Sequence, residues 1–147
     1  MAVARLFGAS IKRREDPRLL TGRGRFTANL KLPGMVYAYF IRSPYAHAKV
    51  KNIDVSKARS VRGVLDVVIG GDIKYYVGPV PCAWQIPGSN LKIPRYMPLA
   101  VDKVRFVGDP VAVVVAESYE AALDAAELVN VGYEVLPCVV NAEEAVN

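Results

Sequence analysis

Residues 107–137 read VGDPVAVVVAESYEAALDAAELVNVGYEVLP, and this stretch decides the fold class. Its unbroken Val/Ala run at 111–116 predicts a strand that is buried on both faces. Ser118 is a good N-cap, and small apolar residues follow at helical spacing, so we expect a helix over about 119–129. An apolar strand at 131–140 comes next. Strand, helix and strand in this order predict one βαβ unit.

The rest of the chain adds further short elements on the N-terminal side. Residues 75–99 hold five of the ten prolines, which predicts a long loop without regular structure. Together the elements predict a mixed α+β domain with one main helix. The other expected elements are strands at 35–41, 47–54, 64–69 and within 99–106, a short helix capped by Asp54 or Ser56 that ends near Arg59, a helical turn capped by Asp72, and a last turn capped by Asn141.

Length and composition indicate one domain that spans residues 1–147. The chain is 52% hydrophobic and 22% charged, which suffices for one core and excludes wholesale disorder. Within this domain we expect residues 1–33 to form a basic irregular arm. Asp16 precedes a proline, which disfavours a helix at Asp16, and Thr21 begins a Gly-containing turn.

The charges are strongly separated along the chain. Residues 1–62 carry a net charge of +11, whereas residues 106–147 carry −8. This pattern favours two oppositely charged halves that fold onto each other or onto one partner. A basic nucleic-acid-binding protein is the alternative. It is disfavoured because Phe26 is the only aromatic residue among the basic residues of 12–31, and such surfaces need stacking aromatics or a basic helix face.

Several classes of protein are excluded by what the sequence lacks. Its apolar runs are far shorter than the roughly 20 residues of a membrane-spanning helix. Arg5 and then Lys12 interrupt the N-terminal region, so we expect no secretory signal and a cytoplasmic location. Cys82, Cys138 and the single histidine give neither a disulfide framework nor the ligands of a zinc site.

The sequence contains no recognisable catalytic motif. Gly22 and Gly24 lack the third glycine and the strand-to-helix context of a dinucleotide-binding loop, so they predict a turn. His47 is the only possible base of a Ser-His-Asp triad, and it lies on an expected strand, where a packed, hydrogen-bonded role is favoured. A small independent enzyme that uses His47 remains the second alternative. We therefore assign no catalytic, cofactor-binding or metal residue, which favours a scaffold or interaction domain.

Four stretches of the sequence together resemble a known family. Their order and spacing are similar to the N-terminal domain of the large subunit of molybdenum hydroxylases, which include xanthine dehydrogenase, aldehyde oxidase and aerobic carbon monoxide dehydrogenase. The most specific pieces are RSPYAHA and VGDPVAVVVAES. The resemblance implies an α/β-hammerhead fold. The stretches are RREDPRLLTGRGRF at 13–26, LPGMVYAYFIRSPYAHAKVKNID at 32–54, VRGVLDVVIGGDI at 61–73, and PLAVDKVRF at 98–106 continued by the stretch quoted first.

The resemblance also implies cofactors and partners for the parent enzyme. In this family the large subunit binds molybdopterin, usually as the cytosine dinucleotide in microbes, and hydroxylates its substrate at molybdenum with oxygen from water. Electrons then pass to [2Fe-2S] clusters on a small subunit and to FAD on a medium subunit. The family's cofactor-binding segments and catalytic glutamate lie beyond this domain. The molybdopterin-binding domain is therefore expected to be absent from this chain, and the chain alone is predicted to be inactive, with a role in structure and assembly.

The candidate docking residues are basic or aromatic. We expect the charge-dense arm to dock against the remainder of the large subunit, because such loops gain order by pairing with other surfaces. Arg42 and His47 flank a Ser-Pro turn and either shape an inter-domain surface or stabilise the turn locally. Trp84 lies on the Pro-rich loop and either marks an interface or packs on the loop itself. The candidates are Arg13, Arg14, Arg18, Arg23, Arg25, Arg42 and Trp84. Asp109 stands where the family often has Gln or Glu.

Overall fold

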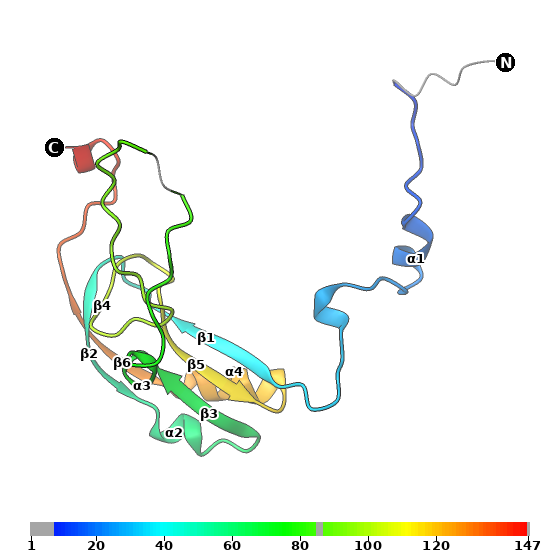
Figure 1. Cartoon of the computed structure of the whole chain (residues 1–147). Helices are drawn as coiled ribbons and strands as arrows, with labels where there is room; N and C mark the ends of the chain where they lie inside the picture. The colour runs from blue at the N-terminus through cyan, green and yellow to red at the C-terminus, as the bar shows by residue number, and fades with distance from the viewer. Residues whose placement is uncertain (1–7, 85–86, 147) are drawn as a thin grey trace. The chain divides into compact units, whose positions relative to one another are not determined.

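The structure is a computed structural model that describes residues 8–84 and 87–146. The chain divides into two compact units, Met1–Met35 and Val36–Asn147. None of the described residues of the first unit is buried. This unit contains the helix α1 (Asp16–Leu20) and the 3-10 helix η1 (Thr27–Asn29), both visible in Figure 1.

The expectation that residues 1–33 are irregular and that Asp16 is not helical is wrong at α1. Pro17 lies in the first turn of α1, where a missing N–H costs nothing and the fixed φ suits a helix. The backbone N–H of Leu19 donates to the carbonyl of Glu15 at 3.1 Å, which closes the turn. The helix then ends at the expected turn, in which Gly22 has a φ of 70°.

The second unit contains two three-stranded antiparallel sheets. The first sheet has the order β1 (Tyr37–Arg42), β5 (Pro110–Ala116) and β3 (Val64–Ile69). Its central strand β5 is the Val/Ala run. Because β5 has a neighbouring strand on each edge, its apolar composition is explained. The mixed helix and strand content is that of the expected α+β class. The second sheet has the order β4 (Lys103–Val104), β2 (Ala48–Asp54) and β6 (Asn130–Val135).

The helix α4 (Tyr119–Glu127) packs on the first sheet, against β1 and β5. It begins as predicted, because the side chain of Ser118 accepts a hydrogen bond from the N–H of Ala121 at 3.1 Å. Its small buried face allows close packing on the sheet. The core below it consists of Ala58, Val67, Val114, Ala116, Ala122, Ala125 and Ala126.

The predicted βαβ unit is wrong. Strands β5 and β6 flank α4 in the sequence but belong to different sheets. Strand β6 pairs antiparallel with β2, where Glu134 forms ion pairs with Lys49 (3.0 Å) and with Lys51. The two ammonium groups, Lys51 first, hold the pKa of Glu134 below its usual value. Opposite charges across neighbouring strands favour this pairing.

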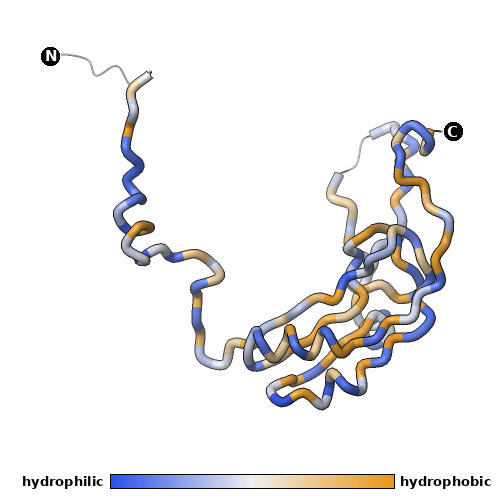
Figure 2. Tube along the Cα trace, turned by 180° about the vertical axis from the view of Figure 1, so that it is seen from behind, coloured by the Kyte–Doolittle hydropathy of each residue, from blue (hydrophilic) through white to orange (hydrophobic). Residues whose placement is uncertain are grey.

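A second small core joins the two sheets. It is formed by Ala48, Ala100, Val104 and Val111, so strand β5 contributes to both cores. Figure 2 shows hydrophobic stretches along the strands of this unit.

The short elements differ from prediction mainly in extent. The helix α2 (Ser56–Arg59) follows Asp54, whose carboxylate accepts the Ser56 N–H at 3.0 Å as expected. In α3 (Gly70–Ile73), Asp72 lies inside the helix rather than before it, and it accepts the N–H of Ile69.

Strand β6 ends before the expected residue 140, because Pro137 cannot donate to a ladder. The 3-10 helix η2 (Glu144–Val146) follows the turn at Asn141. The described part of 75–99 contains neither helix nor strand, as predicted. Among the described residues, no helix is long and apolar enough to cross a bilayer.

Candidate functional site

The five arginines of the arm are all exposed. Arg13 forms an ion pair with Asp16 at 3.2 Å and Arg18 forms one with Glu15 at 2.9 Å, and both pairs lie within the arm itself. Exposed ion pairs of this kind contribute little to stability. The described part of this unit therefore offers charged groups but no buried core to hold them in place.

Large apolar side chains accompany these arginines in the first unit. Leu20 is 86% exposed and Phe26 is 64% exposed. Ordering such a segment costs conformational entropy, which buried apolar contacts normally offset. The mixture of exposed arginines and exposed apolar side chains is typical of a segment that becomes ordered against another surface.

Arg42 and His47 both make hydrogen bonds within the second unit. The guanidinium of Arg42 donates to the carbonyl of Gly108 at 2.9 Å and lies 5.9 Å from the ring centroid of Phe40. The ring Nδ1 of His47 donates to the carbonyl of Pro137 at 2.7 Å. These contacts connect the turn after β1 to segments that are distant in sequence.

In the described part of the chain, the contact of the His47 side chain is with a backbone carbonyl, that of Pro137. No three His, Cys, Asp or Glu residues cluster at metal-binding distance within residues 8–84 and 87–146. The His47 ring is occupied by its bond to a carbonyl, which suits a structural histidine. Nothing in the described chain favours an independent enzyme.

Trp84 lies on the long loop between α3 and β4 and is 74% exposed. Its carbonyl accepts a hydrogen bond from the thiol of Cys82 at 3.0 Å. The indole is therefore available at the surface, and the alternative in which it packs on its own loop is not what the structure shows. The two sides of the loop are joined by the N–H of Val80, which donates to the carbonyl of Tyr96 at 2.7 Å.

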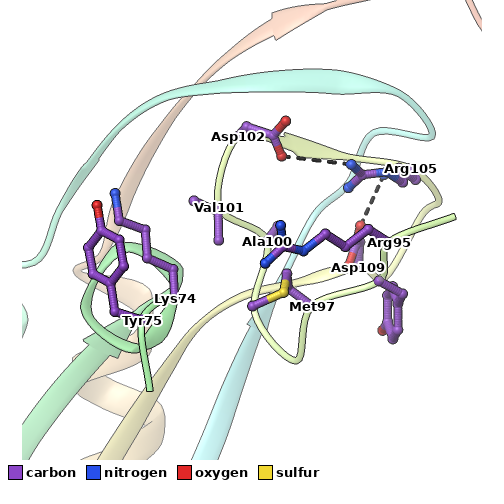
Figure 3. Close-up of a pocket in the computed structure, with 10 residues that line it drawn as sticks. Lys74, Tyr75, Arg95, Met97, Ala100, Val101, Asp102, Arg105 and Asp109 are labelled. Carbon is purple, nitrogen blue, oxygen red and sulfur yellow. Dashed lines mark hydrogen bonds and ion pairs between the residues drawn. The ribbon is translucent and has the colours of Figure 1, made fainter. Parts of the chain in front are cut away.

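The structure also defines a pocket that sequence reasoning missed. Its volume is about 370 Å³, and it lies between α3, the end of the long loop and the turn that precedes β5 (Figure 3). Asp109 lines it and is only 1% exposed. Burial raises the pKa of Asp109, and the N–H and charge of Arg105 oppose this. Lys74, Tyr75, Arg95, Tyr96, Met97, Ala100, Val101, Asp102 and Arg105 complete the lining.

No signal in the sequence pointed to this pocket. Asp109 follows Gly108, whose φ is 93°. The other lining residues come from three separate segments, and no periodicity or spacing predicts that they meet.

The two sheets, the helix on one of them and the long loop between α3 and β4 define an α/β-hammerhead domain. The sequence profile described as "Aldehyde oxidase and xanthine dehydrogenase, a/b hammerhead domain" matches residues 21–137. The chain therefore belongs to this family, and the fold and family expected from the four stretches are confirmed.

Similar proteins are known both as sequences and as structures. The nicotine 6-hydroxylase large subunit of Paenarthrobacter nicotinovorans is 39% identical over 142 residues, which is 96% of this chain and 17% of that protein. The crystal structure of quinoline 2-oxidoreductase from Pseudomonas putida 86 is 45% identical with a TM-score of 0.80, covering 95% of this chain and 17% of that one.

The crystal structure of the Cu,Mo-CO dehydrogenase in its carbon monoxide reduced state is 39% identical with a TM-score of 0.76. The match covers 94% of this chain and 16% of that one. The chain thus spans about a sixth of the length of these relatives.

Proposed function

We propose that this chain serves as the N-terminal structural and assembly domain of the large subunit of a molybdenum hydroxylase in the cytoplasm. The observation that carries the proposal is a match over nearly the whole chain to about a sixth of much longer oxidoreductases. One of these relatives is described as a Cu,Mo enzyme and another as a large subunit. The chain itself has no role in the chemical steps.

The described residues do not define a site for the molybdenum cofactor. The pocket at Asp109 mixes the carboxylates of Asp102 and Asp109 with the cations of Lys74, Arg95 and Arg105, rather than offering a glycine-rich loop of backbone N–H donors of the kind that holds phosphates. No described cluster of ligating side chains offers an alternative. In our proposal molybdopterin, in its cytosine dinucleotide form, therefore binds to the part of the large subunit outside this chain. Iron–sulfur and FAD subunits complete the enzyme.

The arm and the loop supply the docking surfaces in this proposal. The arginines of the arm, which are exposed, pair with acidic groups on the remainder of the large subunit, and the exposed apolar side chains of the arm become buried there. Trp84 contributes a large aromatic surface of the kind that dominates interface energetics. The core of the second unit, by contrast, uses none of these residues.

Deletion of residues 1–25 tests the proposal. The deleted segment contributes no residue to either described core, so the truncated chain keeps its cooperative thermal unfolding. It fails to assemble with the remainder of the enzyme, measured as molybdenum per purified complex. A matched control replaces the exposed basic residues Lys57 and Arg62, which lie outside the arm, with glutamine.

Two results would contradict this assignment. Loss of the cooperative melt on deletion of 1–25 would show that the arm belongs to the core of this domain. Full molybdenum content in the truncated complex would show that the arm is not needed for assembly.

A further inference from the structure

The long loop between α3 and β4 carries positive charge that no acidic group within the loop balances. From residue 73 to residue 101 the sequence contains Lys74, Lys92 and Arg95 but no aspartate or glutamate. Among the described residues, neither Lys92 nor Arg95 forms an ion pair. Arg95 extends into the pocket that Asp109 lines (Figure 3), whereas Lys92 lines a separate groove. A negatively charged partner is attracted to this loop.

The separate groove lies between the two sides of the loop and is lined mainly by apolar side chains. Its volume is about 370 Å³. The N–H of Val80 donates to the carbonyl of Tyr96, which holds the two sides together. Lys92 is the one charged side chain among the described residues that line the groove. Val80, Pro81 and Cys82 line it from one side of the loop, and Leu91, Ile93 and Pro94 line it from the other.

Much of the apolar surface of this groove is in contact with water. Leu91 and Ile93 are each 49% exposed. Removal of apolar surface from water is favourable, and exposed apolar patches rimmed by polar groups mark binding sites on protein surfaces. An apolar side chain of a partner that enters the groove therefore gains free energy by burying this surface together with its own.

Lys92 selects the charge of the occupant. Its ammonium repels a basic group. A wholly apolar occupant displaces water from the ammonium without replacing the hydrogen bonds that are lost, which is costly. A carboxylate beside the apolar side chain instead accepts a charge-assisted hydrogen bond from the ammonium. The groove thus favours an apolar group that has an acidic neighbour.

A polypeptide segment meets these requirements better than an anionic lipid surface, which also combines apolar and acidic groups. A bilayer contacts side chains that protrude, whereas the apolar surface of this site lines a groove. Pro81 and Pro94 lack the N–H that pairing with a further β-strand needs. The groove therefore recognises the side chains of a segment rather than adding a strand.

We propose that this groove binds an acidic segment of a partner polypeptide. An apolar side chain of the segment enters between Val80 and Ile93, and a neighbouring carboxylate of the segment pairs with Lys92. The inference deepens the docking role proposed above for the loop, and it rests on that proposal for its partner, which is another part of the same enzyme.

The test is an NMR titration of the isotope-labelled 147-residue chain with three end-blocked pentapeptides, EELEE, EEGEE and KKLKK. The second peptide lacks the apolar side chain, and the third keeps it but reverses the charge. EELEE is expected to shift the amide signals of Lys92 and Ile93 saturably and at a lower concentration than either of the other two peptides.

Two variants in the groove separate the contributions of charge and apolar contact. Lys92 and Ile93 are exposed on the loop, so their replacement leaves the fold intact. Lys92→Glu is expected to weaken EELEE binding by about threefold to tenfold and to strengthen KKLKK binding. Ile93→Ser is expected to bring EELEE down to the affinity of EEGEE. Arg62→Glu, an exposed change of the same charge outside the loop, is the matched control and leaves all three peptides unaffected.

Vesicles of phosphatidylserine and phosphatidylcholine test the lipid alternative. The proposal is overturned if no peptide saturates, if KKLKK binds as tightly as EELEE, if Lys92→Glu binds EELEE as the unaltered chain does, or if the chain sediments with the vesicles without binding EELEE. These outcomes leave the molybdenum content of the native complex unchanged, whereas absence of molybdenum from that complex contradicts the proposed function, whatever the peptides do.

Discussion

The neighbouring residues Gly70 and Gly71 begin α3, and the structure predicts opposite responses to the same substitution. A Cβ added at Gly70 would collide with the carbonyl oxygen of Ala100, and it would lie 2.8 Å from the carbonyl carbon. A Cβ at Gly71 would meet only the side chain of Ile69, at 3.8 Å, which is an ordinary contact. Gly70→Ala therefore tests the packing of α3 on the segment before β4, and Gly71→Ala is its matched control.

The magnitude follows from how firmly Ala100 is held. Ala100 is 5% exposed and its N–H donates to the carbonyl of Pro110 at 2.8 Å, so the backbone cannot move away without breaking that bond. Overpacking of this kind costs about 1–3 kcal/mol. At Gly71 the change to alanine restricts the unfolded chain and ranges from neutral to about 1 kcal/mol stabilising.

The assay is equilibrium unfolding in urea, followed by circular dichroism on the 147-residue chain and on both variants. Gly70→Ala is expected to lower the urea midpoint with an unchanged slope. In thermal unfolding, each kcal/mol of lost stability corresponds to a fall of about 4 °C in Tm. Equal stability of Gly70→Ala and the unaltered chain, or an equal loss in Gly71→Ala, would refute the packing argument.

Three further predictions concern single side chains. Ser118→Ala removes the N-cap of α4 and should cost about 1 kcal/mol in urea unfolding, whereas Ser10→Ala in the exposed arm should cost nothing measurable. His47→Ala removes the bond to the Pro137 carbonyl and should destabilise the chain by about 1 kcal/mol, and unchanged stability would contradict the structural role. Because burial raises the pKa of Asp109, its ionised form opposes folding, so Asp109→Asn should be more stable than the unaltered chain at neutral pH. That advantage should shrink as pH falls through the raised pKa towards 3.8, and an advantage that grows in acid would reverse the sign of the argument.

The central elements of the fold were predictable because local signals and tertiary packing agree there. The Val/Ala run became the central strand β5, and Ser118 capped α4 as expected. The errors arose where two local rules compete or where pairing is decided at long range. Pro17 disfavours helix at the preceding residue but is tolerated in a first turn, and the second effect prevailed. The partner of β6 was set by β2, through Glu134, rather than by its nearest strand in sequence.

The candidate site was less accessible to sequence reasoning. The exposure of Trp84 and the local contacts of Arg42 depend on packing that a single sequence does not reveal. The pocket at Asp109 depends on three segments that meet in space, and a single sequence without spacing signals does not reveal such a meeting.

The most direct test of the central claim is the molybdenum content of the complex that this chain forms in its native cells. The chain is tagged at its C-terminus, purified under native conditions and separated by size, and molybdenum and protein are quantified in each fraction. The account predicts that molybdenum elutes with the tagged polypeptide in one large complex, and that deletion of residues 1–25 removes it. A tagged polypeptide that elutes without molybdenum would contradict the proposed role in the assembly of a molybdenum hydroxylase.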